Sequence, residues 1–134
     1  MSQTAPLKPS VPMHVLADGE GWEPVPGGAP GVEQRMLSGA LDEDARCGVR
    51  TRLIRFRAGT VAPNVFVHDY WEEVYLIEGT LIAGCDAEGR GGTAFSAPGY
   101  ACRPPGTEHG PFAAPEGCLF FEIQYYAAPE GRVR

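Results

Sequence analysis

The chain has 134 residues, of which 43% are hydrophobic and 21% charged, and its formal net charge at pH 7 is -6. This length is typical of one globular domain, large enough for a hydrophobic core without disulfides. The acidic balance argues against a nucleic-acid partner, whose phosphates require a basic face. No apolar run reaches the length of a membrane span, and the N-terminus lacks the pattern of a signal peptide. We therefore expect a cytoplasmic protein without membrane association.

The first part of the chain is irregular. Pro6, Pro9 and Pro12 remove donors that a sheet would need, so residues 1–19 are predicted to form an N-terminal arm. Residues 20–134 are predicted to form one folded domain, which begins with a Gly- and Pro-rich stretch. We expect both irregular regions to cover this domain or to be exchanged with a partner subunit.

From residue 32 onward, short apolar or alternating runs are separated by Gly and Pro signals, and no window has a helical period. This pattern predicts an all-β sandwich or barrel. Glu78-Gly79 has the composition of a tight hairpin turn, and residues 86–92 that of a Gly-rich loop. The predicted strands are 32–38, 50–57, 65–68, 72–77, 80–85, 93–96, 100–103 and 118–126.

Two histidines and one glutamate have the clearest chemistry. His68 ends a predicted strand, Glu72 opens the next one, and His109 follows a Pro-Pro-Gly turn. Imidazole and carboxylate ligands suit first-row divalent metals, and three protein ligands leave coordination positions open. Alternation along a strand places Phe66 and His68 on one face, which would direct His68 into a barrel interior. The alternative is a hydrogen-bonded histidine and a solvated glutamate; His14 is interpreted as a surface residue.

Apolar and aromatic side chains are expected to enclose this site and to suit an aromatic or apolar ligand. Arg103 is predicted to reach the same pocket and to act in catalysis, whereas Glu73 should face away from Glu72. The arginines at 50, 52, 55 and 57 either hold a ligand carboxylate or, more commonly for such clusters, protect an edge strand. The predicted pocket residues are Phe66, Tyr70, Trp71, Val74, Tyr75, Leu76, Phe95, Tyr100, Phe112 and Phe120.

The two histidine-bearing segments resemble the two motifs of the cupin family, and the resemblance implies a single-domain jelly-roll β-barrel over roughly residues 20–126. Residues 22–28 and 103–106 are similar to the subgroup that includes the cupin domain of the zinc anti-sigma factor ChrR and small dicarbonyl-cleaving dioxygenases. Gly59, His68, Glu72 and Gly79 match the first motif, and Gly99, Pro104-Pro105-Gly106 and His109 match the second.

One position departs from the family pattern. Phe66 stands where the family usually has its first histidine ligand, so the expected three-His-one-Glu site is reduced to His68, Glu72 and His109. These three either still bind a metal as a facial triad or remain from a decayed site that binds an organic ligand. We expect the first; Asn64 or Tyr75 could supply a fourth ligand.

The resemblance to metal cupins implies reactions on small oxygenated molecules. We expect one divalent ion, with Fe(II) favoured over Zn, Mn or Ni, and a non-haem iron-type oxygenase acting on a small dicarbonyl or phenolic compound. One alternative is a ligand- or zinc-sensing cupin without turnover. Another is a metal-free isomerase or lyase, in which His68 and Glu72 exchange protons and the apolar lumen raises the pKa of Glu72. We also expect a homodimer, formed through the arm and the strand at 118–126.

Overall fold

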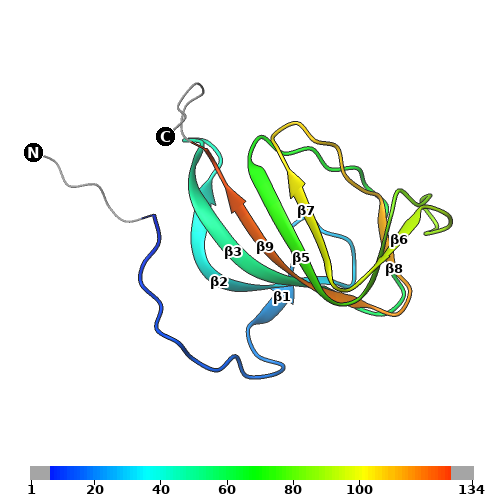
Figure 1. Ribbon diagram of the computed structural model, residues 1–134, viewed down its shortest axis with the longest axis horizontal. Coiled ribbons are helices and arrows are strands. Elements are labelled where there is room, and N and C mark those ends of the chain that lie inside the picture. The colour runs from blue at the N-terminus through cyan, green and yellow to red at the C-terminus, as the bar shows by residue number, and fades with distance from the viewer. Residues whose placement is uncertain (1–6, 128–134) are drawn as a thin grey trace, which may run out of the picture.

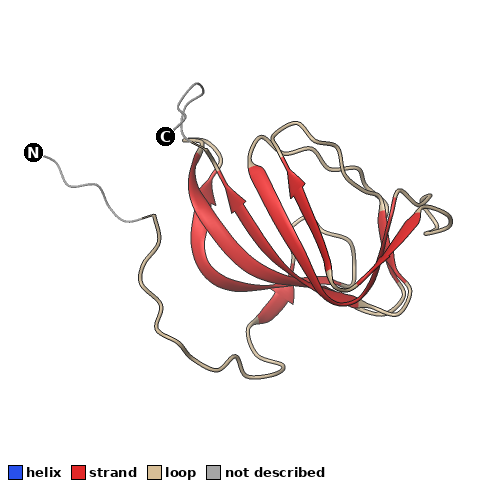
Figure 2. Cartoon of the chain, in the orientation of Figure 1, coloured by secondary structure: helices blue, strands red, loops and turns tan. Residues whose placement is uncertain are grey.

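The computed structural model describes residues 7–127, in which nine antiparallel strands curl around a common interior (Figure 1). Strands and loops make up all of this part of the chain (Figure 2), and it contains no helix that could cross a membrane. The all-β jelly-roll prediction is confirmed. The strands are β1 Trp22–Pro24, β2 Val32–Asp42, β3 Cys47–Phe56, β4 Thr60–Ala62, β5 Trp71–Ala83, β6 Thr93–Ser96, β7 Gly99–Arg103, β8 Phe112–Ala114 and β9 Cys118–Tyr125.

The strands form two walls that share β5. The larger wall has the order β1-β2-β3-β9-β5, with β7 also paired to β5, and the smaller wall joins β5 to β6 and β8 and then β8 to β4. Figure 1 shows the larger wall curving around one side and the smaller wall lying opposite. Burial alternates strictly along β9, as expected for a strand with one face on the interior. The space between the walls is therefore lined by every second side chain.

Glu78-Gly79 is not a hairpin turn, which corrects the prediction. β5 runs without interruption through both residues, and its register with β9 shifts between Leu76 and Glu78. Gly79 has a φ of +81°, and a Cβ there would lie 2.3 Å from the Gly117 carbonyl oxygen. This irregularity bends β5 from the larger wall into the smaller one, a function that β-bulges commonly serve.

The predicted strand at 65–68 is also wrong. This segment is a loop that makes one isolated bridge, between Phe66 and His109. The short strands β1, β4 and β8 were missed, because three residues are too few to show an alternating pattern. The Gly-rich loop at 86–92 joins β5 to β6, and the Asp86 carboxylate accepts hydrogen bonds from the backbone N–H groups of Glu88 and Arg90.

Residues 7–21 contain no strand and lie outside the sheet. Two contacts tie them to the larger wall: the Lys8 ammonium donates to the Thr51 hydroxyl, and the Arg35 guanidinium donates to the Ala17 carbonyl at 2.7 Å. The remainder of the predicted arm, residues 1–6, and the last part of the predicted domain, residues 128–134, lie outside the described residues.

Candidate metal centre

Two loops bring the histidines together. His68 lies on the loop between β4 and β5, and His109 lies on the loop between β7 and β8. The backbone N–H of Phe66 donates to the His109 carbonyl at 2.8 Å, and that of His109 donates to the Phe66 carbonyl at 3.0 Å. The N–H of Gly106, in the Pro-Pro-Gly turn, donates to the His68 carbonyl at 2.8 Å. Because these bonds connect the loops directly, the two imidazole rings lie 4.9 Å apart between centroids.

Glu72 completes the group from the neighbouring strand. It is the second residue of β5, where its side chain points inward and is 4% exposed. One ligand atom from each of His68, Glu72 and His109 lies within 4.8 Å of the other two. The Nε2 atom of His109 is 3.3 Å from a carboxylate oxygen of Glu72. The fold therefore brings together the three residues that the sequence predicts as ligands.

The proton positions of His109 fit a cation between these groups. Its Nδ1 atom is 3.2 Å from the Thr107 carbonyl oxygen, an acceptor that requires the proton on Nδ1. Burial lowers the pKa of His109 despite the opposing charge of Glu72, so the ring is neutral and its Nε2 lone pair faces a carboxylate oxygen. Adjacent ligands about 2.1 Å from one ion stand roughly 3–3.4 Å apart. The observed 3.3 Å falls in this range, so the donors present fit a divalent metal.

The protonation states of the other groups also suit metal binding. Burial lowers the pKa of His68, which favours the neutral imidazole that a metal needs. The expectation of a raised pKa at Glu72 is wrong. Burial raises it, but hydrogen bonds from Glu122 and Gln124 and the charge of Arg103 together lower it. Burial and the proximity of Glu72 instead raise the pKa of Glu122 to about 8, so Glu72 is the carboxylate that remains ionised.

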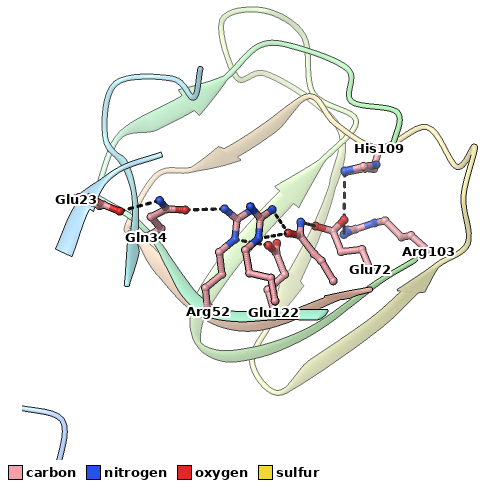
Figure 3. Close-up of polar contacts among 9 residues, drawn as sticks. Glu23, Gln34, Arg52, Glu72, Arg103, His109 and Glu122 are labelled. Carbon is pink, nitrogen blue, oxygen red and sulfur yellow. Dashed lines mark hydrogen bonds and ion pairs between the residues drawn. The ribbon is translucent and has the colours of Figure 1, made fainter. Parts of the chain in front are cut away.

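A chain of buried polar side chains holds Glu72 in place (Figure 3). Gln34 accepts a hydrogen bond from Arg52 at 2.7 Å, and Arg52 pairs with Glu122 at 2.6 Å. One carboxylate oxygen of Glu72 accepts a hydrogen bond from the Gln124 amide at 3.1 Å, and the other pairs with the Arg103 guanidinium at 3.2 Å. No buried side-chain polar atom of the described residues is left without a partner. This network fixes the orientation of the candidate ligand, a role that outer-shell groups play in metal sites.

Sequence reasoning missed Glu122 and Gln124, although a signal was present. Both lie an even number of residues from Phe120 on the same strand, and Phe120 was expected to face the interior. Because side chains alternate along β9, both of them also point inward. The edge-strand interpretation of the arginines is wrong, because β3 is paired on both sides, with β2 and β9. Arg50 and Arg52 line the interior, whereas Arg55 and Arg57 contact Glu33 outside it.

The three candidate ligands lie on the wall of a cavity of about 350 Å³. Arg103 also lines it, as expected. Of the predicted pocket residues, Phe66, Tyr70, Val74, Phe112 and Phe120 line this cavity.

The other predicted pocket residues lie elsewhere. Leu76 is buried in the hydrophobic core without lining the cavity. Tyr75 and Trp71 alternate with inward-facing Glu72 and so lie on the outer face, where Trp71 stacks on Tyr125. Phe95 and Tyr100 are 52% and 64% exposed. The assignment failed for these residues because the sequence alone did not show which face of each strand is covered.

Aromatic side chains surround the imidazoles. The Phe66 ring lies 5.8 Å from His109 and 6.3 Å from His68. The Tyr70 ring stacks on His68 at 4.5 Å. The fourth ligands considered from sequence are not in place: Asn64 is exposed, and Tyr75 is on the outer face.

Comparison with known proteins agrees with this architecture. The family described as the ChrR cupin-like domain matches residues 11–127. An acetylacetone dioxygenase from Acinetobacter johnsonii is 20% identical, with a TM-score of 0.61 over 92% of this chain and 83% of that chain. An RmlC-like cupin from Shewanella frigidimarina is 21% identical, with a TM-score of 0.58 over 88% of this chain and 96% of that chain. No curated protein sequence matches. The family match spans almost all of the described residues, and the chain belongs to the ChrR cupin-like family of the cupin superfamily.

Proposed function

We propose that this protein is a metal-dependent cupin, a non-haem iron-type oxygenase that acts on a small dicarbonyl or phenolic compound. The observation that carries the proposal is the convergence of His68, Glu72 and His109 on one point in the wall of a cavity. Two histidines and one carboxylate with open positions are the ligand set of non-haem Fe(II) oxygenases. The fold similarity to an acetylacetone dioxygenase supports a dicarbonyl substrate.

The side chains around the site have separate roles in this proposal. His68, Glu72 and His109 would hold the ion, which supplies a Lewis acid and a place for oxygen when bound. Arg103 lies 3.2 Å from Glu72 and can use its remaining N–H groups to bind an enolate or phenolate oxygen. Apolar side chains that line the cavity, including Phe112 and Phe120, would exclude water and orient the carbon skeleton.

The metal-free isomerase or lyase is a weaker candidate. It needs Glu72 as a general acid near neutral pH, but the hydrogen bonds and charges around Glu72 lower its pKa. No contact of the described residues favours the sensor over the enzyme.

The first test is the metal content of untagged protein, measured by elemental analysis after reconstitution with Fe(II), Mn(II), Ni(II) or Zn(II). We expect about one equivalent in the wild type and a loss of metal in the variants His68→Ala and His109→Ala. His14→Ala is the matched control, because His14 is exposed and its ring contacts only the Pro12 carbonyl. Equal metal content in all four proteins would overturn the proposed site.

The second test is oxygen consumption by the Fe(II)-loaded protein with acetylacetone and with catechol as probes. We expect uptake that depends on iron and disappears in His109→Ala. Bound iron without oxygen uptake for any dicarbonyl or phenolic probe would contradict the oxygenase and leave the metal site intact.

A further inference from the structure

Three arginines line the cavity, and they differ in their partners. Arg52 pairs with Glu122 at 2.6 Å, and Arg103 pairs with Glu72 at 3.2 Å. Arg50 has no ion pair with any carboxylate of residues 7–127; its Nε and Nη2 atoms donate to the neutral amide oxygen of Gln124. Arg50 is therefore a cavity cation without a counter-ion in the described part of the chain.

The sheet register places Arg50 at a defined position relative to the candidate ligands. Arg50 on β3 is opposite Gln124 on β9, which is opposite Glu72 on β5. The Gln124 amide nitrogen donates to Glu72 at 3.1 Å, so this one side chain connects the arginine to the metal ligand. Neighbouring strands are about 4.8 Å apart, which places the backbones of Arg50 and Glu72 roughly 10 Å apart. A small ligand can span that separation.

Tyr70 lies in the same part of the cavity. Its ring stacks on His68 at 4.5 Å. The phenolic hydroxyl of Tyr70 can donate a hydrogen bond. Tyr70 and Arg50 both line the cavity. Two kinds of donor, a guanidinium and a phenol, are thus available beside the candidate metal centre.

The charges of this region favour an anion. The partly buried guanidinium of Arg50 has lost part of its hydration, and the nearby Arg52 adds to the positive potential; both effects lower the pKa of Arg50. Glu43 also lines the cavity, but it is exposed on the loop after β2 and forms no ion pair with Arg50. A desolvated cation without a partner is costly, and a bound carboxylate would offset that cost through charge-assisted hydrogen bonds.

We propose that Arg50 and Tyr70 form a carboxylate-binding subsite, so that the ligand of this cavity is a small dicarbonyl or phenolic acid. The carboxylate binds to the free edge of the Arg50 guanidinium and to the Tyr70 hydroxyl. The oxygen atoms of the dicarbonyl or phenol then face His68, Glu72 and His109. The orientation toward the metal rests on the proposed function, whereas the binding of the carboxylate does not require the metal.

The test compares two probes with the same diketone skeleton, acetylpyruvate, which carries a carboxylate, and acetylacetone, which does not. Dissociation constants are measured by calorimetry for metal-free protein and for protein loaded with zinc, which supports binding without oxidation. We expect wild-type protein to bind acetylpyruvate about 10- to 100-fold more tightly than acetylacetone, because hydrogen bonds between charged partners contribute more than neutral ones.

Three variants assign this preference to residues. Arg50→Gln should lose most of it and Tyr70→Phe part of it. Arg57→Gln is the matched control: it removes the same charge from a side chain that is 64% exposed outside the cavity, and it should keep the full preference. Because Arg50→Gln could disturb Gln124, the zinc affinity of each variant is measured in parallel. Arg50→Lys is also tested, and it should restore part of the preference for acetylpyruvate.

The outcomes separate the two proposals. An equal affinity for both probes in the wild type, or an unchanged preference in both Arg50→Gln and Tyr70→Phe, would overturn the subsite even if the metal site is real. A preference for acetylpyruvate that persists in metal-free protein and disappears in Arg50→Gln would support the subsite even if no metal or oxygen uptake is found.

Discussion

Gln124 is 1% exposed, the lowest exposure of any polar side chain in residues 7–127. Its amide oxygen accepts from Arg50, and its amide nitrogen donates to Glu72. An amide can satisfy a cation and an anion at once because it offers both an acceptor and donors. This one residue therefore connects the proposed carboxylate subsite to the candidate metal ligand.

Replacing Gln124 with leucine should weaken both the fold and the metal site. The substitution keeps a similar volume but leaves Arg50 and one oxygen of Glu72 without a partner, which should lower the free energy of unfolding by about 2–3 kcal/mol. Loss of an outer-shell hydrogen bond should also weaken metal binding about 10- to 100-fold. Urea unfolding of metal-free protein and a chelator competition titration measure the two effects. Asn64→Leu, at an exposed position, is the control, and unaltered metal affinity in Gln124→Leu would contradict the outer-shell role.

At the scale of elements, β5 carries opposite chemistry on its two faces. Glu72 points into the cavity, and Glu73 points to the outer face, as alternation predicts. There the Glu73 carboxylate accepts a hydrogen bond from Tyr100 on β7 at 2.5 Å and one from Tyr125 on β9 at 2.9 Å. These bonds join the three neighbouring strands that position Glu72 and Arg103.

The Glu73 contacts should make stability depend on pH in a predictable direction. Hydrogen bonds from Tyr100 and then Tyr125 lower the pKa of Glu73 below its ordinary value of 4.5. A lowered carboxyl pKa stabilises the fold above the unfolded-state pKa, and this stabilisation is lost as the pH falls through the folded-state pKa. Glu73→Gln should therefore reduce the free energy of unfolding by about 0.5–1 kcal/mol at pH 7, where the bonds are partly solvated.

Urea unfolding at several pH values tests this expectation, and the difference between wild type and Glu73→Gln should shrink toward pH 3. Glu78→Gln is the matched control on the same strand, since Glu78 is exposed; it should change the free energy by less than about 0.5 kcal/mol at pH 7. A difference that is constant across the whole pH range would contradict the role of the Glu73 charge.

At the scale of the whole molecule, apolar side chains on the outer face of the larger wall are incompletely covered. Tyr75, Ile77 and Tyr100 are 49%, 40% and 64% exposed, and Tyr75 is directly opposite Tyr100 on the paired strands. In the arm, Met13 and Val15 are almost fully exposed. We propose that these surfaces are buried in a homodimer, because exposed apolar patches commonly mark interaction sites.

Sedimentation equilibrium at micromolar concentration should give a mass of twice the 14.4 kDa of one chain. Ile77→Arg should shift the mass toward one chain, because a charge at the centre of a buried apolar interface has no partner. Ala94→Arg, on the exposed strand β6, should remain dimeric. A wild-type mass of 14.4 kDa would contradict the dimer.

Local chemistry in the sequence determined the all-β class and the three candidate ligands, and the resemblance to the cupin motifs implied the jelly roll. His109 follows a Pro-Pro-Gly turn, and the spacing of His68, Glu72 and His109 matches the two cupin motifs. Strand alternation also placed Val74 on the same face as Glu72, and Val74 lines the cavity with it.

Tertiary structure decided the features that depend on which strands are neighbours. Glu78-Gly79 has the composition of a turn, but the close approach of Gly117 requires a glycine within a continuous strand. The arginines resembled an edge-strand cluster until pairing with β9 placed Arg50 and Arg52 inside. The low pKa of Glu72 depends on Glu122, Arg103 and Gln124, which come from two other strands. Which residues of a strand share a face is a local property of the sequence. Which strands pair, and which face of each strand is buried, is set only when the whole barrel closes.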